Sequence, residues 1–220
     1  LLRLEGEAVR DAMLAVSGVL CHKGGGPPVP VKEDADGSIV VGEDRKAESN
    51  RPGDDVPMGE EAWRRTVYVQ ARRTRPLSFT SAFDAPVMET NCTRRAVSIV
   101  APQALTLLNG AFAREQAEIF AKRLEKEAGG DGEARIQRAF HLAFARSPTR
   151  AETDEAMAFL TIAAPPAGVG IPATAAIPAT AAIPATAAAQ ALSPQPDAVH
   201  AALVHFCHVI FNASEFIFID

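Results

Sequence analysis

The sequence has 220 residues and a formal net charge of −5; 47% of its residues are hydrophobic and 6% are aromatic. This length allows one domain, or two small ones, with a sizeable core. The negative charge argues against nucleic acid as a partner, because that binding depends on many lysine and arginine contacts to phosphates. No apolar run reaches about 18 residues, so the sequence predicts no membrane span. Composition alone indicates a soluble, mostly helical module and no specific activity.

The first twenty residues place apolar side chains three and four residues apart, which is typical of an amphipathic helix. The predicted buried stripe consists of Leu1, Leu4, Ala8, Ala12, Val16 and Val19. Glycines and prolines at 24–28 end this helix. Because the chain starts within a predicted helix, with neither an initiator methionine nor a signal peptide, we expect it to be the tail of a longer protein.

A β-hairpin is predicted over 29–41, where Asp36 and Gly37 form a turn signal between β-branched residues. Residues 66–71 have the composition of another short strand, which we expect to pair with the hairpin. Acidic residues predominate from 32 to 61, where we predict a solvated loop.

Seven arginines then lie between residues 62 and 95, against two acidic residues. Arg72, Arg73 and Arg75 could bind an acidic polysaccharide through forked hydrogen bonds. The simpler interpretation is that they neutralise the acidic loop.

The second half of the chain predicts several helices, the clearest of which covers 102–126. Its predicted buried stripe consists of Leu105, Leu108, Phe112, Ile119, Phe120 and Leu124. Asp131 is placed to cap a second helix, and Thr149 and Glu152 match the capping box at the start of a third.

Residues 171–188 repeat Ile-Pro-Ala-Thr-Ala-Ala three times. A proline every six residues interrupts any long α-helix, so we predict that 163–196 is a largely disordered linker. A last helix begins at Asp197, and we expect it to dock onto the helices before the linker. The predicted fold is therefore mainly α, with a small hairpin element and with 1–162 plus 197–220 forming one discontinuous helical domain.

No metal site is predicted. Residues 32–43 have the oxygen spacing of an EF-hand calcium loop, but Lys32 occupies the first position, and Pro30 and Gly42 oppose the flanking helices. We therefore interpret this segment as a plain hairpin.

The three cysteines, Cys21, Cys92 and Cys207, are too few and too widely spaced for a disulfide framework. No Cys-x-x-Cys motif is present that would bind zinc or attach haem. His205 and His208 flank Cys207, which we interpret as a core position between two partly exposed histidines.

Glu7 and Asp11 lie on one face of the predicted first helix, a spacing that paired acid and base carboxylates can use. Arg3 and Arg10 are close by in the sequence, so we interpret the four residues as a surface ion network.

The most informative feature is an ordered set of motifs. These are Arg64-Arg65-Thr-Val-Tyr-Val-Gln, Phe83-Asp84-Ala-Pro, Asn91-Cys92-Thr-Arg94-Arg95-Ala-Val-Ser98 and Pro102-Gln103-Ala-Leu-Thr-Leu-Leu-Asn109. Together with shorter matches over nearly all of 1–160 and 197–220, they resemble the C-terminal domain of unknown function of planctomycete-type multidomain proteins. Many of those proteins also carry a cytochrome c-like domain.

The resemblance implies an exported, periplasmic or cell-surface protein whose upstream domains adjoin this helical end. It implies no established activity, and any haem would belong to an upstream domain, so we expect no cofactor in this segment. The candidate binding residues are the polar residues of the motifs, Asp84, Arg94, Arg95, Arg64 and Arg65.

Two functions follow from the resemblance. The first is a noncatalytic module that packs against upstream domains, in which Asp84 pairs with Arg94 or Arg95 to fix a loop crossing. The second is a hydrolytic or carbohydrate-binding cleft that these three residues, with Glu7 or Asp11, complete together with the missing domains.

Overall fold

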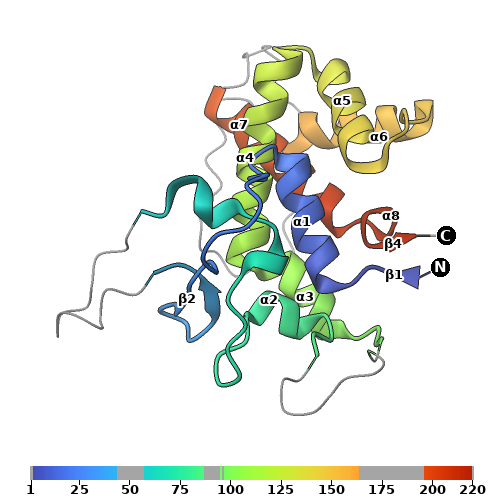
Figure 1. Cartoon of the computed structure of the whole chain (residues 1–220). Coiled ribbons are helices and arrows are strands. Elements are labelled where there is room, and N and C mark those ends of the chain that lie inside the picture. The colour runs from blue at the N-terminus through green and yellow to red at the C-terminus, as the bar shows by residue number, and fades with distance from the viewer. Residues whose placement is uncertain (1, 44–56, 87–94, 96, 164–195, 220) are drawn as a thin grey trace, which may run out of the picture.

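The computed structural model describes residues 2–43, 57–86, 95, 97–163 and 196–219, and the fold is mainly α, as predicted (Figure 1). The helices are α1 (Gly6–Ser17), α2 (Ser78–Ala82), α3 (Ala101–Asn109), α4 (Ala111–Ala128), α5 (Gly132–Phe144), α6 (Arg150–Ala163), α7 (Pro196–Asn212) and α8 (Ser214–Ile217). Figure 1 shows α5 and α6 together at one end of the molecule and α2 and α3 at the other. The predicted linker lies almost entirely outside the described residues.

The core is built around α4 and α7, which pack closely along each other. Phe120 of α4 and Phe211 of α7 are both fully buried, with ring centroids 5.6 Å apart. The C-terminal helix also contacts α6, so it docks onto the helices that precede the linker, as predicted. Leu203, Phe206 and Ile210 of α7 are buried as well, and burial of this apolar face stabilises the docked helix.

The first helix is shorter than predicted, because it begins at Gly6 after a short strand, β1 (Leu2–Arg3). This strand pairs antiparallel with β4 (Phe218–Ile219), which brings the two ends of the chain side by side (Figure 1). The predicted stripe is wrong in part. Val16 is buried as predicted, but Ala8 is exposed, and Val9, Arg10 and Met13 are buried as well. The spacing of apolar residues alone did not reveal the buried face, because Arg10 lies within that face.

The predicted helix over 102–126 is in fact two helices, α3 and α4, joined at Gly110. The backbone of Gly110 is extended (φ −64°, ψ 135°), and a Cβ atom there would lie 2.3 Å from the Thr106 carbonyl oxygen. Only glycine fits this turn without a shift of the backbone. Because the two helix axes diverge at this point, Leu105 and Leu108 lie outside the core, contrary to prediction.

The hairpin is confirmed as β2 (Val31–Glu33) paired antiparallel with β3 (Ile39–Val41). Gly37 at its turn has φ +83°, the left-handed conformation that glycine adopts without strain. The predicted strand at 66–71 is wrong, since the chain there forms the 3₁₀ helix η3 (Thr66–Tyr68). A single parallel bridge from Val29 to Val69 is what remains of the expected pairing.

Both predicted helix caps are confirmed. The Asp131 carboxylate accepts a hydrogen bond of 3.0 Å from the Glu133 amide at the start of α5. At the start of α6 the Thr149 amide donates to the Glu152 carboxylate (2.7 Å), and the Glu152 amide donates to the Thr149 hydroxyl (3.3 Å). These bonds satisfy backbone donors that the helices leave free.

Candidate functional site

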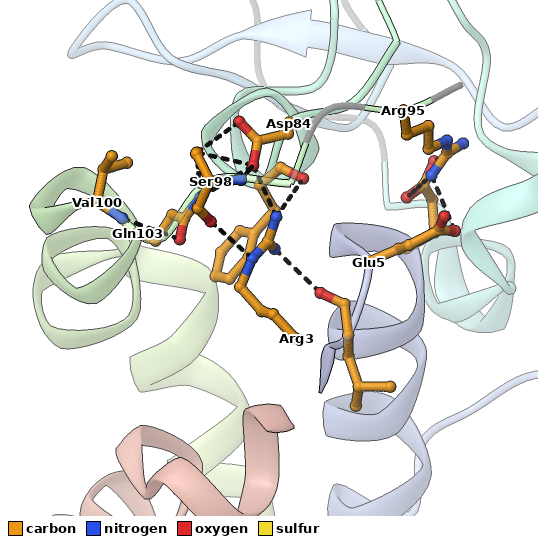
Figure 2. Close-up of polar contacts among 10 residues, drawn as sticks. Arg3, Glu5, Asp84, Arg95, Ser98, Val100 and Gln103 are labelled. Atoms are coloured by element: carbon orange, nitrogen blue, oxygen red, sulfur yellow. Dashed lines mark hydrogen bonds and ion pairs between the residues drawn. The ribbon is translucent and has the colours of Figure 1, made fainter. Parts of the chain in front are cut away.

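Asp84 forms the centre of a polar cluster at the end of α2. Its backbone is left-handed (φ +59°), a conformation that aspartate adopts more readily than most residues. The carboxylate accepts hydrogen bonds of 2.8 Å from both the amide and the hydroxyl of Ser98, and one of 3.3 Å from the Gln103 side chain. Figure 2 shows these side chains pointing toward one another. The cluster therefore ties the segment before α3 to the end of α2.

The ion-pair partner of Asp84 is Arg3, which the sequence did not predict. Nη2 of Arg3 lies 2.7 Å from Oδ2 of Asp84, and its Nε donates to the Ser98 carbonyl oxygen at 3.0 Å. Arg3 is almost fully buried, because strand β1 directs it inward, whereas the predicted helix placed it in a surface network. The Ser98 amide, above all, lowers the pKa of the Asp84 carboxyl below its ordinary value.

Arg95, the partner expected for Asp84, instead binds the start of α1. Its two terminal nitrogens lie 3.0 Å and 2.9 Å from the two carboxylate oxygens of Glu7, and Glu5 contacts the same guanidinium at 2.9 Å (Figure 2). Two parallel hydrogen bonds of this kind fix the orientation of the two side chains and also pair their charges. Arg94 lies outside the described residues.

Arg10 is a second buried guanidinium, contrary to the prediction that it belongs to a surface ion network. Its side chain is 2% exposed and donates to the carbonyl oxygens of Arg64 (3.0 Å) and Ala62 (3.3 Å) and to the Thr66 hydroxyl (3.2 Å). Burial lowers the pKa of Arg10 to about 10, so it remains charged at neutral pH. The sequence contained one indication that Arg10 is buried: its helical spacing from Gly6, Met13 and Ser17, which share the buried face of α1.

The candidate residues Arg64 and Arg65 lie in different environments, one buried and one exposed. Arg64 is 1% exposed; its guanidinium donates to the carbonyl oxygens of Gly25 and Pro27 and stacks on the Tyr68 ring, 4.3 Å from its centroid. Arg65 is exposed and donates to Asp11 at 3.2 Å. Arg64 thus anchors the glycine-rich loop that follows α1, while Arg65 adds a surface contact.

These contacts define what the arrangement can do chemically. The carboxylates of Asp84, Glu7 and Asp11 are all bonded to donors of the chain itself. Asp84, whose pKa is lowered and whose oxygens accept hydrogen bonds from Ser98 and Gln103, is a weak general base at neutral pH. The motif residues that the structure describes instead join α1 to the segments that precede η3 and α3.

The other predicted features have structural roles. Asp36 of the EF-hand-like segment accepts hydrogen bonds from Ser38 within the hairpin turn, as expected for a plain hairpin. Cys207 is fully buried, which raises the pKa of its thiol, and His208 contacts the Leu107 carbonyl oxygen at 2.8 Å. Among the described residues, no three His, Cys, Asp or Glu side chains are grouped to hold a metal ion. No helix in the same ranges has the length and apolar character to cross a bilayer.

A family model described as PSD1, protein of unknown function (DUF1553), matches residues 1–160. The chain belongs to this family. The PSD1 match includes the three buried arginines Arg3, Arg10 and Arg64, Asp84 and all of α1 to α5, and it confirms that the resemblance was to a domain of unknown function. No curated protein and no solved structure shows significant similarity to the chain.

Proposed function

We propose that this PSD1 chain is a noncatalytic interaction module that packs against upstream domains of a larger exported or surface-associated polypeptide. The observation that carries the proposal is a concentration of exposed apolar side chains around α3. We call it the α3 apolar surface, and it consists of Val97, Ile99, Val100, Leu105 and Leu108.

The α3 apolar surface is unusual for a part of the chain that faces solvent. Ile99 is 75% exposed, and Leu105 and Leu108 are 53% and 55% exposed. The two leucines are three residues apart, so they are neighbours on one face of α3, while Leu107 on the opposite face is buried. A helix that is apolar on both sides is normally covered on both sides, and exposed patches of this kind mark interaction sites.

The position of this surface favours a partner in the same polypeptide. The Ser98 carbonyl oxygen accepts a hydrogen bond from Arg3, so the surface begins beside the strand through which the chain enters the module. A domain that precedes Leu1 would be tethered next to the α3 apolar surface. Its effective concentration there would be high enough for a modest interface to remain closed.

The wider context in this proposal comes from the motif resemblance alone. It suggests export and a preceding cytochrome c-like domain, which would hold any haem. A hydrolytic or carbohydrate-binding cleft at Asp84 has less support, because Ser98, Arg3 and Gln103 already occupy its carboxylate oxygens.

The experiment is to express the upstream part of the natural polypeptide and this chain as separate proteins and to titrate one with the other by calorimetry. We expect a one-to-one complex with the negative heat-capacity change that burial of apolar surface produces. Absence of association at any accessible concentration would contradict the proposal.

A further inference from the structure

A cavity of about 750 Å³ lies where α1 ends, between the loop 18–23 and the 3₁₀ helix η2 (Gly59–Trp63). Its lining includes Cys21, His22, Lys23, Glu60 and Trp63. The volume falls within the range of small-molecule sites, roughly 300–1,000 Å³. None of these five residues belongs to the α3 apolar surface, so the cavity is independent of the proposed docking function.

The two walls of the cavity are joined directly. The Cys21 amide donates to the Trp63 carbonyl oxygen at 3.0 Å, and the two residues that follow, His22 and Lys23, extend along the same wall. Lys23 forms an ion pair with Glu61 of η2. Buried Arg64, next to Trp63, holds the glycine-rich loop in place. Because these contacts hold the two walls together, the cavity exists before any ligand binds.

The side chains that remain available have complementary chemistry. Trp63 is the sole tryptophan of the sequence and is half-buried, so part of the indole remains accessible at the cavity. His22 and Glu60 are exposed, and within the described part of the chain neither forms a side-chain hydrogen bond or ion pair. The site thus combines a flat apolar ring, a carboxylate acceptor and an imidazole.

Local charge selects against ionic ligands. The Lys23 ammonium and the Arg64 guanidinium both contact Glu61, and together with the Glu60 carboxylate these four formal charges sum to zero. An anion would be repelled by Glu60, and a cation would meet Lys23 and a single aromatic ring where a cage of several is the usual solution. A neutral ligand rich in hydroxyl groups avoids both penalties.

We propose that the cavity between 18–23 and η2 binds a neutral carbohydrate, with one sugar ring stacked on Trp63. The apolar C–H face of a pyranose matches the indole ring, while its hydroxyl groups donate to the Glu60 carboxylate and hydrogen-bond to the His22 imidazole. Binding is noncovalent, and the site forms entirely from residues of this chain.

Trp63 provides its own reporter, since all tryptophan fluorescence of the chain comes from this cavity. The whole chain is titrated with cellohexaose, xylohexaose and mannohexaose as neutral probes, choline as a cationic probe and polygalacturonate as an anionic probe. We expect a saturable change in Trp63 emission with at least one neutral probe and no change with the charged ones. A flat response to all three neutral probes up to about 10 mM, the limit of weak specific binding, overturns the proposal. So does a saturable response confined to choline or polygalacturonate.

Calorimetry with variants then locates the binding. Glu60→Gln removes an exposed charge without touching the core, and we expect about tenfold weaker binding because a charge-assisted hydrogen bond is lost. Trp63→Phe, with the fold checked by circular dichroism, reduces the stacking area and weakens binding as well. Glu155→Gln on α6, an equally exposed position away from the cavity, leaves the affinity unchanged. Equal affinity of the wild type and Glu60→Gln would overturn the assignment.

Discussion

The Arg3 guanidinium and the Asp84 carboxylate are 81 positions apart in the sequence and 2.7 Å apart in the structure. The pair joins strand β1 to the end of α2. Ser98 bonds to both partners, so one contact fixes β1, the end of α2 and the start of the α3 apolar surface. The residue that looked most like a catalytic acid is therefore an anchor for the surface that we propose docks.

Asp84→Asn is expected to lower the free energy of unfolding by about 2 kcal/mol, because a buried guanidinium loses its charged acceptor. Asparagine tolerates the left-handed backbone, so the decrease in the free energy of unfolding measures the effect of removing the charge. Asp84→Ala is expected to cost more, since alanine adds backbone strain. Urea denaturation measures both, with Asp154→Asn at an exposed position of α6 as the matched control. Equal stability of Asp84→Asn and the wild type would show that the pair is not an anchor.

Arg10→Met is expected to destabilise the chain by about 3 kcal/mol, because two carbonyl oxygens and a hydroxyl lose their donor. Arg10→Lys is not expected to rescue it, since a single ammonium cannot reproduce contacts that Nη1 and Nη2 make in different directions. Arg65→Lys is the matched control and is expected to be nearly neutral, because that side chain is exposed. Thermal melting measures the stability of each variant. An Arg10→Lys protein as stable as the wild type would contradict the role given to the two terminal nitrogens of the Arg10 guanidinium.

Arg146 hydrogen bonds, above all, hold the pKa of Glu152 at about 2, below its ordinary value of 4.5. As the pH falls, the unfolded chain takes up the proton first, so this contribution to stability is present above about pH 4.5 and is lost progressively toward pH 2. Glu152→Gln is expected to flatten the stability profile in that window. Urea midpoints at several acidic pH values test this, with Glu155→Gln on the same helix as the control. An unchanged acid slope in Glu152→Gln would refute the assignment.

The predicted discontinuous domain, 1–162 plus 197–220, can be tested by deletion. Removing 197–220 exposes the core faces of α4 and α6 and removes Phe211, so we expect loss of the cooperative melting transition. Removing only 171–188 is the matched control and is expected to leave the transition in place. A deletion of 197–220 that melts like the wild type would show that the first part folds by itself.

Local signals in the sequence predicted what local interactions determine. The caps of α5 and α6 depend on residues two or three positions apart, and the hairpin depends on one Asp-Gly pair, so these elements could be located in advance. The break at Gly110 was missed because apolar spacing continues across it, and the exposure of Leu105 and Leu108 followed from that break. Buried arginines were missed because an ionised side chain is expected at the surface unless its partners are known.

In the candidate site, too, local features could be predicted from the sequence, whereas long-range contacts could not. The motif residues were singled out as a group, but which of them meet depends on long-range packing. Arg3, placed inward by the pairing of the two chain ends, could not be matched to Asp84 from spacing. The Trp63 cavity was missed because its walls come from two segments that a parallel bridge between Cys21 and Arg64 brings together.

The central claim, docking through the α3 apolar surface, is tested most directly by the affinity of the separately expressed upstream domains for surface variants of this chain. We predict that Leu105→Asp and Leu108→Asp each weaken binding at least about tenfold, because each places a charge in an apolar interface, while the melting temperature stays close to that of the wild type. Val67→Asp is the matched control, at an apolar side chain of η3 that is 72% exposed, and it should bind normally. Unchanged affinity in both leucine variants would contradict the account.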